Sequence, residues 1–170
     1  MTFIIDGTNG LTFPNTTTQV SGGKVIQVVY GSTTSQVSGT TVSYTDTGVS
    51  ASITPLFSNS KILVITTIDA FYSGSQNQAG GGIRLLRGST VISYPVENTS
   101  NNPYGTAVGT VTNGFCGLRE TITVLDSPST TSSTTYKTQI ASILSNVTFW
   151  VNKADGTNPI STITLMEIAA

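Results

Sequence analysis

KILVITTIDAFY, residues 61–72, is the strongest strand signal in this 170-residue chain. Val, Ile, Thr, Phe and Tyr fill the run, and these side chains favour extended backbone. Its first residues are almost continuously apolar, which is typical of a strand that is buried on both faces. The run therefore predicts a central strand deep inside a β-sheet protein.

Shorter runs of the same kind lie on both sides of this stretch, and each is bounded by Gly, Asn, Ser, Pro or Asp. They fall at residues 24–30, 41–47, 49–54, 83–86, 91–96, 106–112, 115–125, 134–144, 147–151 and 160–168. Gly88 supplies the flexible turn position of a hairpin between two of them. No apolar stripe has helical spacing. The pattern predicts an all-β fold, an antiparallel β-sandwich of roughly eight to ten strands.

Two of these runs also predict which side chains face the core, because strand residues alternate between faces. The inward-facing side chains are expected to be Leu118, Ile122, Val124, Ile163, Leu165 and Ile168.

Charge is scarce along the whole chain. Only 9% of residues are charged, against roughly 25% in ordinary globular domains. Ser and Thr make up close to a third of the chain, and the hydrophobic fraction is 37%. The net charge of −1 leaves little self-repulsion to oppose association. The seven cations are spread out, so no basic stripe predicts nucleic-acid binding. This composition favours a durable, particle-bound protein over a freely diffusing enzyme.

The sequence offers little support for catalysis. The chain has no histidine, which removes the usual general base and the commonest metal ligand. Asp69 is unusual because it lies inside an apolar strand, and we interpret it as a buried or interfacial acid that pairs with Arg84 or Arg119. No two acids are placed together by the sequence. We therefore predict no enzyme activity, no catalytic residue, no cofactor and no metal site.

Several features have competing interpretations. Cys116 is expected to be a small buried side chain, with an interchain disulfide or reactive thiol as the alternative. The glycine run at residues 80–82 is interpreted as a flexible tip or close-contact turn. Trp150 is expected in the core or in a subunit interface, with carbohydrate contact as the alternative. The polar residues between Asn152 and Asn158 indicate a turn more than a calcium site.

Residues 1–23 differ from residues 24–170, which form the predicted sandwich domain. The first tract ends in a Ser-Gly-Gly sequence that is typical of a hinge, and it is too short to fold alone. We expect it to dock on sister chains or another protein, or else to pack on its own domain. Its candidate docking side chains are Ile4, Ile5, Leu11 and Phe13. No apolar run is long enough to predict membrane insertion, and no signal peptide is evident.

Residues 97–105 (ENTSNNPYG) form a polar loop. Its candidate contact residues are Asn101, Asn102 and Tyr104, because loops on a rigid sandwich commonly carry binding. A host surface glycan is one partner such a loop would contact. A plain solvent-exposed loop is the alternative.

GLTFPNTTTQ, residues 10–19, resembles the G-x-x-F-P-D-G-T-x-Q-T segment of phage tail-fibre proteins, with Asn15-Thr16 in place of the usual Asp-Gly. The rest of the chain resembles a domain of phage structural proteins. The matching stretches, in order, are KVIQVVY, VSASITP, SKILVITTIDAFY, IRLLRGSTVIS, LDSPSTTSSTTYKTQ and STITLMEI. The resemblance implies a jelly-roll-like sandwich, usually a homotrimer, similar in shape to the C1q and tumour-necrosis-factor domains.

Two roles on the outer surface of a virion follow from this resemblance. As a capsid decoration (cement) protein, the chain would bind the major capsid protein through its N-terminal tract. As a tail-fibre tip, it would bind a host receptor. The tail-fibre motif favours the second role. The length favours the first, because Met1 lies almost at the docking tract. Decoration is our preferred expectation, and a lectin module or a glycan-cleaving enzyme is a weaker alternative.

Overall fold

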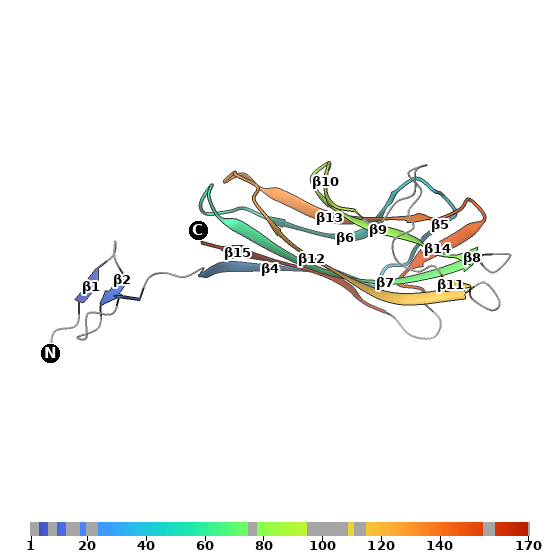
Figure 1. The fold of residues 1–170 in the computed structure, drawn as a ribbon, viewed down its shortest axis with the longest axis horizontal. Helices are drawn as coiled ribbons and strands as arrows, with labels where there is room; N and C mark the ends of the chain where they lie inside the picture. The colour runs from blue at the N-terminus through green and yellow to red at the C-terminus, as the bar shows by residue number, and fades with distance from the viewer. Residues whose placement is uncertain are drawn as a thin grey trace.

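A computed structural model describes most of the chain, and every element in the described part is a β-strand. The described residues are 4–6, 10–12, 18–19, 24–74, 78–94, 109–110, 115–154 and 159–169. The strands pair antiparallel, and two large sheets pack face to face as a β-sandwich (Figure 1). The predicted fold class is confirmed.

The larger sheet has six strands and is built around β7 (Lys61–Gly74), the longest strand. The other five are β4 (Val25–Thr33), β5 (Val37–Gly39), β12 (Phe115–Asp126), β14 (Val147–Val151) and β15 (Ser161–Ile168). β12 follows one edge of β7 over almost its full length. The other edge is shared, because β15 pairs with the first half of β7 and β14 with the second half. The sheet is therefore split on one side of its central strand.

The second sheet has four strands in the order β10-β9-β13-β6. They are β6 (Thr45–Ile53), β9 (Gly81–Arg87), β10 (Thr90–Ser93) and β13 (Thr134–Ser142). β9 and β10 form the expected hairpin, and Gly88 has a φ of 57°, a backbone region that glycine adopts without steric cost.

The core lies between these sheets and contains side chains from both. Tyr72, Tyr136 and Phe149 are the largest uncharged side chains that are fully buried there. Ile163 and Leu165 are buried as predicted, and Leu118, Ile122 and Val124 pack against the core while half-buried. Alternation along β7 places Ile62, Val64, Thr66, Ile68, Ala70 and Tyr72 on the inner face.

Five short strands lie outside the two large sheets in the described part of the chain. β1 (Ile4–Asp6), β2 (Gly10–Thr12) and β3 (Thr18–Gln19) form a three-stranded sheet, and β8 (Gln78–Ala79) pairs with β11 (Gly109–Thr110). Figure 1 shows β1 and β2 beyond the end of the sandwich at which β4 begins. The C-terminal end of β15 lies at that same end, because Ala169 N–H donates to the Lys24 carbonyl at 2.9 Å.

Three sequence predictions are wrong in detail. The runs at 41–47 and 49–54 are not separate strands, because β6 continues through Gly48, whose φ of 83° accommodates a shift in register against β13. β7 is not buried on both faces, since its outer side chains are half-buried or exposed. Ile168 does not face inward, because strand alternation puts Glu167 there with 0% exposure.

The glycine run is the fourth difference. Gly81 and Gly82 belong to β9 and are buried, so the interpretation as a flexible tip is wrong. A Cβ at Gly81 would overlap the Ala141 carbonyl oxygen and the Tyr72 ring. The alternative of a close contact is therefore correct, although it lies in a strand and not in a turn.

Candidate functional site

The outer face of the four-stranded sheet is polar, and its charged and amide side chains form hydrogen bonds with one another. Arg84 Nε donates to Gln139 Oε1 at 2.9 Å, and the guanidinium carbon lies 3.9 Å from the Tyr44 ring centroid. Asp46 accepts from Gln139 at 2.7 Å and from Lys137 at 2.9 Å. Partial burial raises the pKa of Asp46, but these hydrogen bonds outweigh burial and hold that pKa below its ordinary value. The polar side chains named here therefore have hydrogen-bond partners within the same chain.

The outer face of the six-stranded sheet is different, because apolar and hydroxyl side chains cover it. Cross-strand pairing places its side chains in rows across β4, β15, β7 and β12. The first row is Val28, Met166, Leu63 and Leu125; the second is Tyr30, Thr164, Ile65 and Thr123; the third is Ser32, Thr162, Thr67 and Thr121. We call these three rows the apolar face.

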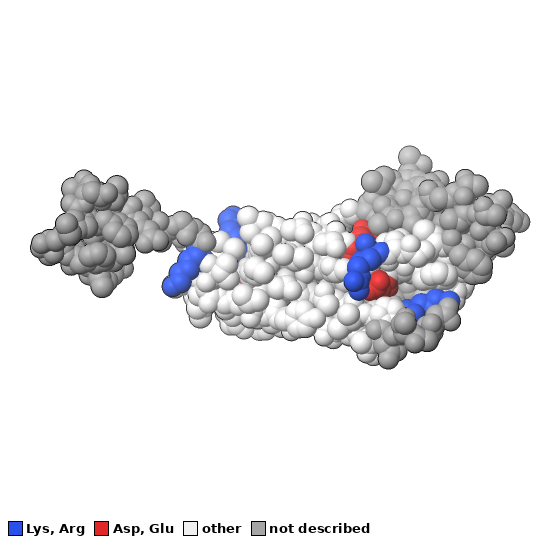
Figure 2. Space-filling model, turned by 90° about the horizontal axis from the view of Figure 1, so that it is seen from below, with Lys and Arg blue, Asp and Glu red and all other residues white. Residues whose placement is uncertain are grey.

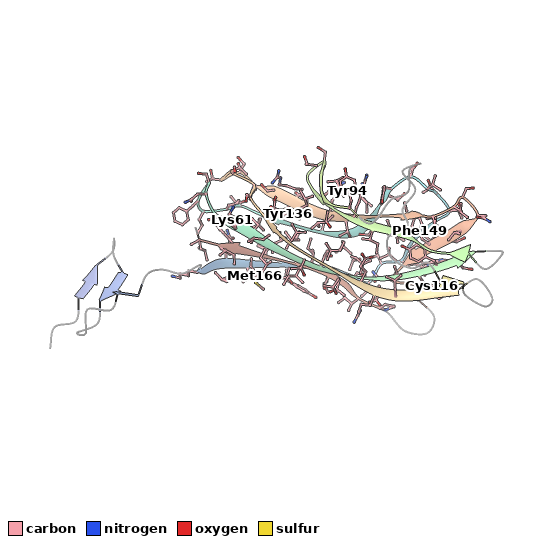
Figure 3. All side chains as sticks on the ribbon, viewed as in Figure 1. Lys61, Tyr94, Cys116, Tyr136, Phe149 and Met166 are labelled. Atoms are coloured by element: carbon pink, nitrogen blue, oxygen red, sulfur yellow. The ribbon has the colours of Figure 1, made fainter. Side chains whose placement is uncertain are left out.

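Charged atoms are absent from most of this surface in Figure 2, which views the molecule from the side of the six-stranded sheet. Met166 points away from the core on this side (Figure 3). Val28, Tyr30 and Leu125 are 57–60% exposed. Large exposed apolar side chains that lie side by side mark contact surfaces more often than scattered ones do.

An exposed loop connects β6 to β7 at one end of the sandwich. Leu56 and Phe57, between β6 and β7, are 60% and 56% exposed. Their backbone N–H groups donate to Glu167 Oε1 at 2.8 and 3.3 Å, and Gln27 Nε2 donates to Glu167 Oε2 at 2.6 Å. Burial raises the pKa of Glu167, but these hydrogen bonds lower it by more than burial raises it. The pKa of Glu167 therefore lies below its ordinary value. A buried carboxylate therefore fixes the loop that exposes two large apolar side chains.

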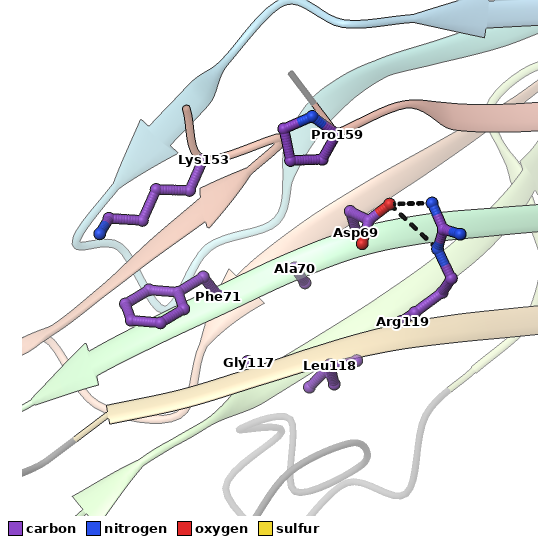
Figure 4. A pocket seen from close by; sticks show the side chains of 8 residues that line it. All are labelled: Asp69, Ala70, Phe71, Gly117, Leu118, Arg119, Lys153 and Pro159. Carbon is purple, nitrogen blue, oxygen red and sulfur yellow. Dashed lines mark hydrogen bonds and ion pairs between the residues drawn. The ribbon is translucent and has the colours of Figure 1, made fainter. Parts of the chain in front are cut away.

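A groove lies on the same sheet, toward its other end. It has a volume of about 470 Å³. Its lining residues are Asp69, Ala70, Phe71, Gly117, Leu118, Arg119, Lys153 and Pro159 (Figure 4). The volume lies within the range of small-molecule sites, about 300–1,000 Å³. We call it the Phe71 groove.

The split in the six-stranded sheet positions this groove. Asn152 sits at the break between β14 and β15, where its N–H donates to the Asp69 carbonyl at 3.0 Å. Its side chain donates to the Thr33 carbonyl at 3.0 Å and accepts from Ser161 Oγ at 2.7 Å. Ser161 Oγ in turn accepts from Asp69 N–H at 3.0 Å. This buried network fixes the chain on both sides of the break, where Lys153 and Pro159 line the groove.

One end of the groove holds an ion pair. Arg119 Nε donates to Asp69 Oδ2 at 3.0 Å, and Nη2 donates to the same oxygen. Arg119 Nη2 also donates to the Ile160 carbonyl at 3.2 Å. The two side chains lie directly opposite each other on β7 and β12, so the sheet register brings them together.

Aromatic rings lie at the other end. Lys153 Nζ is 4.5 Å from the Phe71 ring centroid and 5.6 Å from that of Trp150. The two rings meet edge to face with centroids 5.7 Å apart. Gly117 lies opposite Phe71, and a Cβ there would come within 3.3 Å of the ring. An exposed cation–π contact of this kind contributes about 0.5–1 kcal/mol.

The structure describes the strand positions of three of the four predicted docking residues. Ile4 and Ile5 lie on β1 and Leu11 on β2, and the backbones of Ile5 and Leu11 pair. Phe13 lies outside the described residues. So do the three candidate loop residues Asn101, Asn102 and Tyr104.

The interpretations of individual residues have mixed outcomes. Asp69 pairs with Arg119, as predicted, whereas Arg84 lies on the other sheet. Trp150 is half-buried on the outer side of β14, so it is not a core residue. Cys116 is half-buried against the core, and burial raises the pKa of its thiol.

Sequence reasoning missed Phe71, Gly117 and Lys153 as site residues. Phe71 is two residues from Asp69 and Gly117 is two residues from Arg119, so each shares a face with the ion pair. That spacing is visible in the sequence. The register that places Phe71 opposite Gly117 and Asp69 opposite Arg119 is not visible there.

The described part of the chain contains no three Cys, Asp or Glu side chains close enough to hold a metal ion. In that same part, no helix is long and apolar enough to cross a membrane. The chain matches no protein-family model, and no curated protein matches it at a significant level.

Proposed function

We propose that this protein is a non-enzymatic bacteriophage virion structural protein that decorates the exterior of the head. In this proposal the sandwich forms a homotrimer through the apolar face, and the N-terminal tract binds the major capsid protein. The trimer and the virion role come from the resemblance to phage structural proteins. The contrast between the two outer faces supports self-association.

The apolar face supplies part of the area that a stable contact needs. Four strands about 4.8 Å apart, over five residues that each rise about 3.4 Å, span roughly 330 Å² of flat sheet. The side chains that project from it add to that area. A standard interface buries about 800 Å² per partner, so the trimer contact would extend beyond these three rows. With a net charge of only −1, two copies meet little electrostatic opposition.

The two ends of the sandwich support an orientation on the capsid. β4 begins and β15 ends at the end that adjoins the N-terminal tract. Lys61 starts β7, directly after the exposed Leu56–Phe57 loop. We propose that this end faces the capsid, which leaves the Phe71 groove at the far end toward solvent.

The Phe71 groove favours a second candidate role, that of a tail-fibre tip or receptor-binding protein. A hollow with an aromatic ring and several charged groups is the kind of site that binds small polar ligands. A receptor-binding protein needs such a site, whereas a cement protein does not.

The copy number in purified virions distinguishes the two roles. Quantitative mass spectrometry against the major capsid protein should give comparable copy numbers for a decoration protein. A ratio of a few per cent would overturn the decoration role and favour the tail-fibre role. Absence from purified particles would contradict both.

Deletion of residues 1–23 tests the docking role of the tract. We expect the remaining sandwich to keep its circular dichroism spectrum and melting temperature while it fails to attach to particles that lack the protein. A folded deletion variant that still attaches would move the capsid contact to the sandwich.

A further inference from the structure

Exposed apolar side chains and two lysines lie together at the end of the sandwich where β4 begins. Leu56 and Phe57 are 60% and 56% exposed, and Val25 is 45% exposed. Lys24 and Lys61 are exposed at the same end. On the face seen in Figure 2, this end shows cationic atoms and no acidic atoms among the described residues. We call these five residues the base surface.

Strand pairing positions three members of the base surface. Ile168, near the end of β15, pairs with Val25 on β4 and with Lys61 on β7. The backbone N–H of Ala169 donates to the Lys24 carbonyl at 2.9 Å. These three members therefore lie on both sides of the last residues of β15.

Hydrogen bonds fix the loop that carries the other two members. The backbone N–H groups of Leu56 and Phe57 donate to Glu167 Oε1 at 2.8 and 3.3 Å, and the Phe57 carbonyl accepts from Ser60 N–H at 3.2 Å. Glu167 is fully buried and accepts a further hydrogen bond from Gln27 Nε2. A loop that is ordered before binding loses less conformational entropy when its side chains meet a partner.

The accessible charge of the base surface is positive. Neither of its lysines forms a salt bridge with a described carboxylate. Lys61 Nζ donates to the neutral Ser127 hydroxyl at 2.7 Å, a contact that leaves the ammonium charge uncompensated. Glu167 is buried, and Asp126, opposite the start of β7, forms an ion pair with an arginine. The partner that complements this surface is apolar at its centre and carries carboxylates at its rim.

We propose that the base surface is a second contact with the major capsid protein, which receives Leu56 and Phe57 in an apolar hollow and places carboxylates against Lys24 and Lys61. This inference rests on the proposed decoration role. Residues 1–23 directly precede Lys24, so a partner that binds this tract lies next to the base surface. The tract then provides a high local concentration, and the base contact fixes the orientation of the sandwich on the capsid.

Attachment of the purified full chain to particles that lack the protein tests this contact. Co-sedimentation over a concentration series, at low and at high salt, gives the affinity. Phe57→Ser should weaken attachment by about tenfold or more at both salt concentrations, because it removes an apolar anchor. Lys24→Gln should weaken attachment at low salt and reduce its salt dependence, because salt screens exposed charges.

Tyr94→Ser and Lys137→Gln are the matched controls. Tyr94 is an aromatic side chain with 61% exposure that lies just beyond β10 (Figure 3), and Lys137 is a lysine on the outer face of the four-stranded sheet. Both control variants should attach as the unmodified chain does. Circular dichroism checks that all four variants are folded.

The outcomes separate this inference from the proposed function. An unmodified chain that does not attach overturns the decoration role and this inference with it. If the unmodified chain attaches and folded Phe57→Ser and Lys24→Gln variants attach equally well, only the base contact is overturned. Vesicles of phosphatidylcholine and phosphatidylserine are a further probe. Vesicle binding that Phe57→Ser abolishes, with unchanged attachment to particles, would assign the base surface to a lipid surface and overturn the proposal.

Discussion

Gln27 Nε2 donates a 2.6 Å hydrogen bond to Glu167 Oε2, which joins β4 to β15 at the end of the sandwich nearest the N-terminal tract. The same amide nitrogen donates to the Thr54 carbonyl at 2.8 Å. Glu167 is fully buried, so its charge is stabilised by these fixed donors and not by water. The pair holds the loop that exposes Leu56 and Phe57.

Glu167→Gln should therefore destabilise the fold. The new amide group would point an N–H at a donor, either Gln27 or the backbone of the loop. We expect a loss of about 2–3 kcal/mol in the free energy of unfolding, measured by urea denaturation at pH 7. Asp46→Asn is the control, because the Asp46 side chain is 54% exposed and its loss should cost less. An equal loss of unfolding free energy in the two variants would contradict the stabilising role of the buried Glu167 carboxylate.

The stabilisation from Glu167 should also depend on pH. Its folded-state pKa is lowered, so the contribution is complete above the ordinary glutamate pKa of about 4.3 and is lost as the pH falls through the folded value. The stability gap between the unmodified chain and Glu167→Gln should therefore narrow below about pH 4. A difference in unfolding free energy that stays constant from pH 7 to pH 3 would contradict the stabilising role of the Glu167 charge.

Gly81→Ala should disturb the contact between the sheets. A methyl group there would overlap the Ala141 carbonyl and the Tyr72 ring, so β9 must shift. We expect a loss of about 1–3 kcal/mol in the free energy of unfolding. Gly88→Asn is the control, because asparagine tolerates a positive φ and nothing lies within 4 Å of a Cβ at Gly88. A fully stable Gly81→Ala variant would show that the sheets do not approach this closely.

The Asp69–Arg119 pair should contribute little to stability. The two side chains are 25% and 56% exposed, and pairs of that kind couple by about 0.2–1 kcal/mol. A double-mutant cycle with Asp69→Ala and Arg119→Ala should return a coupling energy in that range from thermal unfolding. A coupling above about 2 kcal/mol would make the pair a structural element and weaken its assignment to ligand binding.

The sequence was sufficient for the fold class, because alternation and β-branched content are local properties. β7, β12, β14 and β15 lie close to their predicted positions. Burial of the outer face of β7 was mispredicted, since Leu63 and Ile65 are apolar although they face outward. An apolar side chain indicates contact with something, and the sequence alone does not distinguish a core from an interface.

The candidate site was less accessible to prediction. Pairing of Asp69 with an arginine followed from charge and strand position, but the choice between Arg84 and Arg119 stayed open. Phe71, Gly117 and Lys153 join that pair only through the register of β7 against β12 and the break at Asn152. Both depend on contacts between residues far apart in the chain, which local patterns do not encode.

Self-association through the apolar face is the central claim, and the native mass tests it most directly. Light scattering on the purified 17.7 kDa chain should give about three times that mass, and Leu125→Lys should return it to the monomer by placing a charge in the first row. Ser52→Lys, on the exposed outer face of the other sheet, should remain a trimer. A monomeric unmodified chain at high concentration, or a Leu125→Lys variant that keeps the trimer mass, would contradict the account.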